Sequence, residues 1–289
     1  MAKVRRSGLD RRRWLTAYCF LAPALAFFVV MFFYPLGNEL VTSLYTGPLA
    51  NQFTGLGNFV QAFQDPAARH SFVVTVQYAA GVLVVSIVLG VLFASILNQV
   101  RASVFFRGVL LVPYLTSVAI VGLLWRNILD PEVGILNRLL VSLGLPGQQW
   151  LTSHPLATIT GIAIWQEIGY TTLLFLAGMQ GIPQTYYEAA VMDGASPWWR
   201  FRHVTLPLLT PTTLFVSIIG VITALQQFAL PFLVTDGGPG DSTDLYGFRL
   251  YDVAFQFRDF GYASALSYLL LVVILILSVV QLRLGRRDA

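Results

Sequence analysis

The chain is a series of long apolar segments separated by short polar ones. A transmembrane helix needs about 20 apolar residues to cross the hydrocarbon core of a bilayer, and six segments approach or exceed this length. They cover residues 14–33, 72–97, 108–125, 156–179, 208–234 and 263–282. The fifth contains Pro211 and Pro231, so a bend or an unwound turn is expected there. The pattern predicts an all-α integral membrane protein with six transmembrane helices.

The composition agrees with a membrane protein. Of 289 residues, 56% are hydrophobic and 11% are charged, whereas soluble domains have about 25% charged residues. The mean hydropathy is +0.70. Membrane lipid is therefore an expected partner, and the net charge of +4 is no evidence for nucleic acid. Cys19 is the single cysteine, so no disulfide forms within the chain.

The positions of the cations predict the orientation, because cytoplasmic segments carry an excess of lysine and arginine. Thirteen of the 18 cations lie before the first span, between the second and third, between the fourth and fifth, or after the sixth. Residues 1–13, the 181–207 loop and the 283–289 tail are thus expected in the cytoplasm, with 14–282 forming the membrane domain. The thirteen are Lys3, Arg5, Arg6, Arg11, Arg12, Arg13, Arg101, Arg107, Arg200, Arg202, Arg283, Arg286 and Arg287.

The first apolar segment has features of a secretory signal. It follows a basic stretch that includes paired arginines, and it contains an A-x-A pattern at residues 24–26. The apolar run nevertheless continues to Phe33, which is longer than the apolar region of a signal peptide. An uncleaved membrane anchor is the favoured interpretation.

Two segments on the predicted outer side have helical spacing of apolar residues. They cover residues 55–66 and 134–145. In the second segment, five apolar residues share one helical face, which is expected to pack against the bundle. These residues are Ile135, Leu136, Leu139, Leu140 and Leu143.

The segment 186–209, "YYEAAVMDGASPWWRFRHVTLPLL", is a charged interruption between two apolar spans. Thr185 and Glu188 fit a capping box at the start of a helix, and Gly194 fits its end. Ser196 and Pro197 are typical of the start of a second helix. From the residues alone, two interpretations stay open. The segment is either an elbow at the membrane surface or a compact knob that enters a groove in another protein.

The same segment resembles the conserved loop of permease subunits of binding-protein-dependent ABC importers. That family has E-A-A, three residues, G, nine residues, I, one residue and L-P. Here Glu188-Ala189-Ala190, Gly194 and Leu206-Pro207 stand at this spacing, with Val204 in place of the isoleucine. Further segments resemble the carbohydrate-uptake branch and its larger maltose-permease-type subunit, and the resemblance covers the chain from the first span onward. They are "GLGNF" (55–59), "FFRGVLLVPYLTSVAIVGLLW" (105–125), "TDGGPGDST" (235–243) and "FGYASALSYLL" (260–270).

The resemblance implies a type I ABC importer permease fold and a role for the loop. In such families the loop is a coupling helix that sits in a cleft of a cytoplasmic ATPase subunit. Glu188 would then meet a cation of the ATPase. The implied coupling residues are Glu188, Ala189, Ala190, Asp193, Gly194, Ala195, Leu206 and Pro207. The implied partners are a second permease in a heterodimer, two ATPase subunits and an extracytoplasmic solute-binding protein, in a bacterial or archaeal plasma (inner) membrane.

Catalytic chemistry is not expected in this chain. Lys3 is the only lysine, so a phosphate-binding loop of the G-x-x-x-x-G-K-[ST] type is absent from the sequence. ATP and magnesium are therefore expected on the partner ATPase, and no cofactor is expected here. No H-E-x-x-H or G-x-S-x-G motif occurs. A metal site is not expected, because His70, His154 and His203 fall in loops on both sides of the membrane.

Polar side chains inside the spans are candidates for a solute pathway, because they are costly in lipid. The fourth and fifth spans provide Gln166, Glu167, Tyr170, Thr223, Gln226, Gln227 and Phe228. Amides, a carboxylate and aromatic rings suit a sugar, but polar groups also join helices within bundles. Both interpretations stay open.

The "TDGGP" segment supplies Gly237, Gly238 and Pro239 as candidate contacts for the solute-binding protein, with a plain turn as the alternative. The expected function is that of a sugar importer permease. Importers of glycerol phosphoesters or another small polar solute are an alternative. An ion-coupled secondary transporter that uses Glu167 is a further one.

Overall fold

The computed structural model describes residues 7–47, 51–100 and 103–285. The predicted cytoplasmic cations Lys3, Arg5, Arg6, Arg101, Arg286 and Arg287 lie outside the described residues. The helices are α1 (Ser7–Phe28), α2 (Tyr34–Thr42), α3 (Gly57–Gln64), α4 (Pro66–Leu97), α5 (Ser103–Leu115), α6 (Val118–Ile128), α7 (Ile135–Ser142), α8 (Trp150–Ser153), α9 (Pro155–Gln180), α10 (Gln184–Met192), α11 (Pro197–Arg200), α12 (Leu206–Leu208), α13 (Thr210–Leu225), α14 (Tyr246–Tyr251) and α15 (Phe260–Gly285). Four π-helical turns continue some of these helices: Val29–Phe33, Phe201–Thr205, Pro231–Thr235 and Asp252–Gln256. Two short antiparallel strands, β1 (Tyr45–Thr46) and β2 (Gln52–Phe53), complete the described elements.

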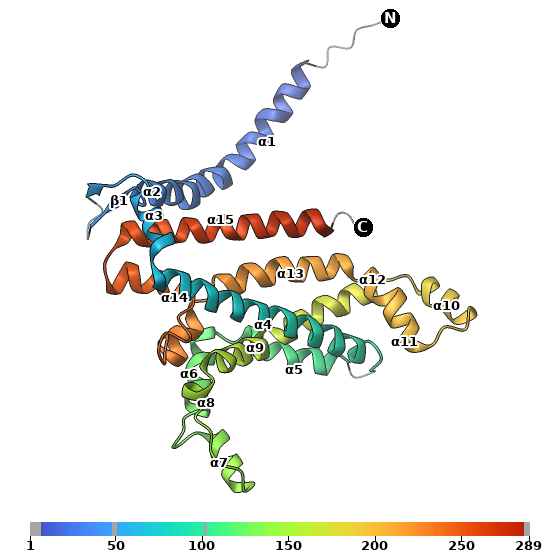
Figure 1. The fold of residues 1–289 in the computed structure, drawn as a ribbon. Coiled ribbons are helices and arrows are strands. Elements are labelled where there is room, and N and C mark those ends of the chain that lie inside the picture. Colours follow the sequence, from blue (N-terminus) through green and yellow to red (C-terminus); the bar gives the residue numbers. More distant parts are fainter. Residues whose placement is uncertain (1–6, 48–50, 101–102, 286–289) are drawn as a thin grey trace, which may run out of the picture.

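The core of the molecule is a bundle formed by α4, α5, α9, α13 and α15, which lie side by side (Figure 1). The most extensive contact joins α4 and α9. Ile159 and Phe175 of α9 are fully buried. In α4, Ala94 is fully buried and Tyr78 is nearly so. Small and aromatic side chains thus interdigitate along this contact, as close packing between helices requires.

The membrane-crossing elements agree with the six predicted segments in number but not in every boundary. Within the described residues, four single helices are long and apolar enough to cross a bilayer: Thr16–Thr42, Pro66–Leu97, Pro155–Gln180 and Phe260–Gly285. Two bent helix pairs bring the number to six, if each pair counts as one span. The first span thus runs nine residues beyond the predicted end at Phe33, and the second begins before the predicted residue 72.

The third and fifth segments are not straight helices. The third bends by 92° between Val104–Leu115 and Val118–Ile128, a break that the sequence analysis did not predict. In the fifth segment the helix α13 ends at Leu225, and the backbone is unwound before it resumes as a π-helical turn at Pro231. This matches the expected interruption. A second bend, of 60°, separates Pro197–Leu208 from Thr210–Leu225.

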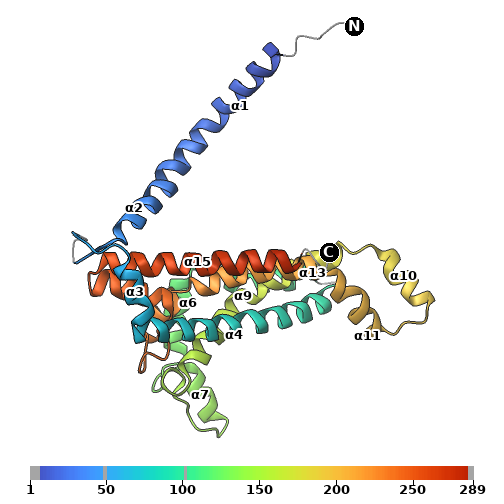
Figure 2. The same ribbon diagram turned by 45° about the horizontal axis from the view of Figure 1, so that its top comes forward.

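The first helical segment stands apart from the bundle. Figure 2 shows α1 and α2 leaving the bundle at an angle, and no described residue between Trp14 and Thr42 is buried. Only the end of this segment meets the bundle, where the hydroxyl of Tyr268 in α15 donates a hydrogen bond to the carbonyl oxygen of Leu36. An apolar helix of this length is stable only where lipid or another protein surrounds it.

The expectation that residues 134–145 pack against the bundle holds only at Leu136, which lies against the buried core, while most of the predicted face does not. Helix α7 projects away from the bundle in both views (Figures 1 and 2), and Ile135, Leu139 and Leu143 are exposed. Asn137 instead fixes the base of this projection. Its amide donates to the carbonyls of Pro131 (3.1 Å) and Gln148 (2.9 Å). The apolar spacing was correctly identified as helical, but periodicity does not show what the apolar face contacts.

Candidate functional site

The charged loop forms a helix, a corner and a second helix at one end of the bundle (Figure 1). The corner is Gly194, with φ of +74°, a conformation that favours glycine. The amide of Gly194 donates to the carbonyl of Val191 at 3.0 Å, and that of Ala195 donates to Ala190 at 2.9 Å. The second helix begins at Ser196, whose hydroxyl accepts from the amide of Trp199 at 3.2 Å. The predicted stop and restart are confirmed.

The predicted capping box at the start of α10 is wrong. The helix begins at Gln184, directly after Pro183, which makes no side-chain cap hydrogen bond. Thr185 therefore lies inside the first turn and not at the cap. The proline explains the difference. Pro183 ends the preceding segment and occupies the cap position itself, so the helix begins at the next residue. Glu188 is left exposed and makes no hydrogen bond or ion pair within the described part of the chain.

The residues of the resembling motif divide into an exposed and an inward-facing group. Glu188, Ala189 and Gly194 are exposed, whereas Ala190 is only 6% exposed and packs within the loop. Asp193 and Pro207 are exposed, and Ala195 and Leu206 are half-buried. Of the two alanines, only Ala189 is therefore accessible to another protein.

The sequence analysis missed Met192, the last residue of α10. Its side chain is 87% exposed, the most exposed large apolar side chain in the described part of the chain. Its spacing provided a signal, because Met192 lies four residues after Glu188 and three after Ala189, on the same helical face. This face of α10 therefore presents a carboxylate and an apolar side chain together.

One hydrogen bond joins the two halves of the loop. The hydroxyl groups of Tyr187 in α10 and Thr205, which follows α11, lie 3.0 Å apart, and Thr205 is buried. This contact connects the exposed corner to the start of the next membrane-crossing pair. The two helices of the loop are thus joined by a side-chain contact as well as by the backbone.

Replacing Tyr187 with phenylalanine is expected to loosen the corner without unfolding the bundle. A hydrogen bond of this kind contributes about 1 kcal/mol, so hydrogen exchange of the α10 amides should accelerate about fivefold. Tyr186→Phe is the matched control, since Tyr186 is exposed and its hydroxyl makes no hydrogen bond within the described residues. Equal exchange in both variants would contradict a bracing role for Tyr187.

Three of the predicted pathway residues line one small cavity within the bundle. Glu167 and Tyr170 reach it from α9, and Thr223 reaches it from α13. Its volume is about 60 Å³. Tyr114 of α5, which the sequence analysis missed, also lines it and stacks on Tyr170 with ring centroids 4.6 Å apart. Tyr114 belongs to a different span, so sequence spacing gave no signal for this pair.

The remaining pathway candidates lie elsewhere. Gln166 donates to the carbonyl of Thr116 at 3.3 Å, at the bend between α5 and α6. Gln227 donates to the hydroxyl of Tyr78 at 3.3 Å. These two amides join separate parts of the bundle through hydrogen bonds. Backbone and hydroxyl groups inside a membrane need such partners, because no water is available there. Gln226 lines a separate hollow against α15, and Phe228 stacks among aromatic side chains.

The candidate contacts for a solute-binding protein lie at the other end of the bundle. Gly238 and Pro239 line a hollow of about 370 Å³ together with Arg126 and Asp130. Gly237 is buried, and a side chain there would meet the ring of Phe248 at 2.6 Å. Gly237 is thus a packing position, and of the three candidates Gly238 and Pro239 are accessible to another protein.

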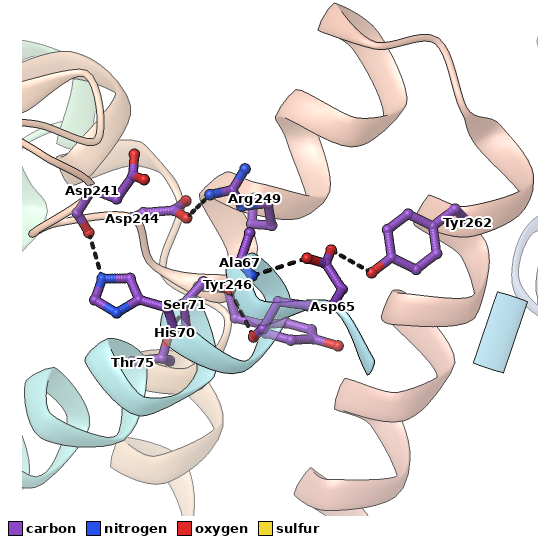
Figure 3. Close-up of polar contacts among 11 residues, drawn as sticks. Asp65, Ala67, His70, Ser71, Thr75, Asp241, Asp244, Tyr246, Arg249 and Tyr262 are labelled. Carbon is purple, nitrogen blue, oxygen red and sulfur yellow. Dashed lines mark hydrogen bonds and ion pairs between the residues drawn. The ribbon is translucent and has the colours of Figure 1, made fainter. Parts of the chain in front are cut away.

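A network of polar contacts holds the loop 236–245 against α4 and α15 (Figure 3). Asp244 forms an ion pair with Arg249 of α14. The amide of Tyr246 donates to the hydroxyl of Thr75 at 2.7 Å. At the other edge, Tyr262 of α15 donates to a carboxylate oxygen of Asp65 at 2.7 Å. The network therefore fixes the relative position of three segments that are far apart in the sequence.

Asp244 is expected to make this network sensitive to pH. Burial raises the pKa of its carboxyl to about 6, and the neighbouring Arg249 offsets only part of this effect. Because the folded-state pKa exceeds the unfolded value, the contribution of this carboxyl to stability should be fully present below about pH 4 and should be lost as the pH rises through about 6. The change should not exceed about 2 kcal/mol once solvent screening is considered. Asp244→Asn should flatten this part of a melting-temperature profile, whereas Asp236→Asn, at an exposed position of the same loop, should preserve it. A profile that Asp244→Asn leaves unchanged would contradict the assignment.

The described residues contain no group of three or more histidine, cysteine or acidic side chains that is suited to a metal ion. His70 instead lies 3.1 Å from the carbonyl oxygen of Asp241, at the edge of the polar network.

Comparison with known proteins assigns the family. Residues 86–287 match the family described as binding-protein-dependent transport system inner membrane component. This match covers more than half of the chain. The chain belongs to this family of inner membrane transport components. The bundle described above is therefore that of an inner membrane transport component.

Individual relatives agree with the family and cover nearly the whole chain. The lactose transport system permease protein LacF of Rhizobium radiobacter is 32% identical over 296 residues, which cover 99% of each chain. The sn-glycerol-3-phosphate transport system permease protein UgpA of Yersinia pestis is 32% identical over 280 residues, which cover 95% of each. In fold, the chain matches a bacterial alginate ABC transporter in complex with its alginate-bound periplasmic protein. The TM-score is 0.85 at 23% identity, over 98% of both chains.

Proposed function

We propose that this chain is the permease subunit of an ATP-driven sugar importer in a bacterial or archaeal inner membrane. It forms half of the translocation pathway, and a second permease forms the other half. A cytoplasmic ATPase hydrolyses ATP with magnesium and moves the bundle through the 186–207 loop. An extracytoplasmic solute-binding protein delivers the sugar at the opposite end.

The observation that carries the proposal is the exposed corner of the loop. Glu188, Ala189 and Met192 share one accessible face beside Gly194, and the carboxylate has no partner in the described chain. A free carboxylate, a small residue and an exposed apolar side chain together suit a groove lined by a cation and apolar groups. The ends of α1 and α15 nearest the chain termini point toward this same end of the bundle (Figure 1), which agrees with cytoplasmic termini.

The cavity in the bundle supports a neutral solute over a phosphate ester. Its described lining contains the carboxylate of Glu167, the hydroxyl of Thr223 and the stacked rings of Tyr114 and Tyr170, but no cation. Sugars bind to hydroxyl and carboxyl groups and stack on rings, whereas a phosphate ester is held best by a cation, which this described lining lacks. At about 60 Å³ the cavity is smaller than the roughly 300 Å³ of a small-molecule site. The passage of a sugar therefore requires the second permease and a movement of the helices.

Uptake into proteoliposomes that contain the assembled transporter and its binding protein tests the proposal. Labelled lactose and sn-glycerol 3-phosphate, the solutes of the two relatives, are compared with and without internal ATP. The proposal predicts ATP-dependent uptake of a sugar and none of the phosphate ester. ATP-dependent uptake of the ester alone would favour the importer of glycerol phosphoesters.

The ion-coupled alternative is tested in the same vesicles. An imposed proton or sodium gradient without ATP is expected to drive no uptake, in the wild type or in Glu167→Gln. Gradient-driven uptake by the wild type that Glu167→Gln abolishes would assign the chain to secondary transport.

A further inference from the structure

An apolar groove lies at the end of the bundle opposite the 186–207 loop, between α3, α4 and α15. Its volume is about 480 Å³, and it is distinct from the cavity that contains Glu167. Phe63 of α3 forms one edge, Phe72 and Val73 of α4 form a second, and Leu269 and Val272 of α15 form a third. Tyr246 lies in the groove with its ring edge against Phe72, at a centroid distance of 6.1 Å.

One cation lines this groove, and no described acidic side chain forms an ion pair with it. Arg69 lines the groove, is exposed, and makes no side-chain hydrogen bond or ion pair within the described chain. Asp65, one helical turn earlier, is already engaged, because its two carboxylate oxygens accept from the amide of Ala67 and the hydroxyl of Tyr262 (Figure 3). The free guanidinium therefore has positive charge and hydrogen-bond donors available for an anion at the end of an apolar groove.

The position of Arg69 matches the level of the lipid headgroups. Helix α4 has 32 residues, which corresponds to about 48 Å, longer than the roughly 30 Å hydrocarbon core. Asp65, Arg69 and His70 are polar, and the apolar stretch of α4 begins at Phe72, so Arg69 lies at the polar end of this helix. The short helix α3 exposes Leu56, Val60 and Phe63, as a helix lying at a membrane surface does.

The groove is short compared with a transmembrane helix. The lining residues of α4 extend from Ala68 to Val73 and those of α15 from Leu269 to Val273. At 1.5 Å per residue these stretches measure roughly 9 Å and 8 Å, whereas a crossing helix needs contact along about 30 Å and is about 10 Å wide. A short apolar groove of this size suits a flexible hydrocarbon chain.

We propose that this groove binds a membrane phospholipid, with one acyl chain between α3, α4 and α15 and its phosphate on Arg69. The site links α3, α4 and α15 at the same end as the polar network of Asp244 and Arg249. A bound lipid therefore adds an apolar contact between α4 and α15 close to the hydrogen bond of Tyr262 with Asp65.

Native mass spectrometry of the assembled transporter tests the site, with phosphatidylglycerol added after delipidation in detergent. Arg69→Gln removes the charge and should weaken the tightest phosphatidylglycerol binding about tenfold, the effect of one charge-assisted contact. Arg138→Gln is the matched control, because Arg138 is an exposed helical arginine outside the groove. Val73→Trp should fill the groove and reduce binding similarly, whereas Val84→Trp, at an equally exposed position of α4, should not.

Two outcomes would overturn the proposal. Equal phosphatidylglycerol binding in the wild type, Arg69→Gln and Val73→Trp would show that the retained lipid is ordinary surrounding lipid. A disulfide cross-link from Val73→Cys to a helix of a second permease would show that protein occupies the groove. Both results are independent of ATP-driven uptake, so they would leave the proposed transport function unaffected.

Discussion

Replacing Gly194 with aspartate is expected to abolish ATP-driven uptake and to release the ATPase, while the chain itself still folds. The chain tolerates the change, because an added side chain meets nothing within 4 Å and aspartate adopts positive φ more readily than most residues. In the docked state the new carboxylate would lie at the corner that enters the ATPase. An unpaired charge buried at an interface costs about 3–5 kcal/mol, which corresponds to at least a hundredfold loss of affinity.

The chain offers a matched control for this experiment. Gly144 has φ of +77° and also has open space around it, but it follows α7 at the other end of the molecule. Gly144→Asp should retain the ATPase and its membrane level. ATPase retained at the wild-type amount by Gly194→Asp, or lost equally in both variants, would contradict the assignment of the corner as the docking point.

Replacing Gly169 with alanine should produce a large loss of stability. A β-carbon at Gly169 would lie 1.8 Å from the carbonyl oxygen of Leu110 in α5. Backbone atoms cannot rotate away, so α5 and α9 would have to separate. Overpacking costs about 1–3 kcal/mol, and the upper end of this range or more is expected here. The separation would also disturb the stacked pair of Tyr114 and Tyr170.

Gly161 is the matched control for this substitution. It lies in the same helix α9, and a β-carbon there meets nothing within 4 Å. Alanine is the better helix former by about 1 kcal/mol, so Gly161→Ala should be neutral or stabilising. Thermal unfolding of the purified proteins measures the difference. A melting temperature of Gly169→Ala equal to that of Gly161→Ala would contradict the close approach of α5 and α9.

The sequence predicted those parts of the structure that depend on local chemistry. Six apolar segments were sufficient to identify a membrane bundle, and Gly194 and Ser196 were sufficient to locate the corner and the second helix. The starts of helices were less well predicted, as Thr185 shows, because Pro183 changed the first turn. These features follow from backbone preferences within a few residues, which a single sequence expresses directly.

Features that depend on contacts between distant segments were not predicted. The 92° bend between α5 and α6 is held partly by Gln166, fifty residues away, so the apolar pattern of the third segment did not reveal it. The seven pathway candidates fell into several places, because polar residues in a membrane serve both packing and solute contact. The exposed face of α7 shows the same difficulty, since its spacing predicts a helix but not the partner of its apolar side.

The most direct test of the central claim is to purify the tagged chain from its native membranes in mild detergent and to identify the proteins that accompany it. We expect a cytoplasmic ATPase and a second permease in the same complex. The ATPase should be lost from Gly194→Asp and retained by Gly144→Asp. A chain that purifies alone, or only with copies of itself and without any ATPase, would contradict an ATP-driven permease.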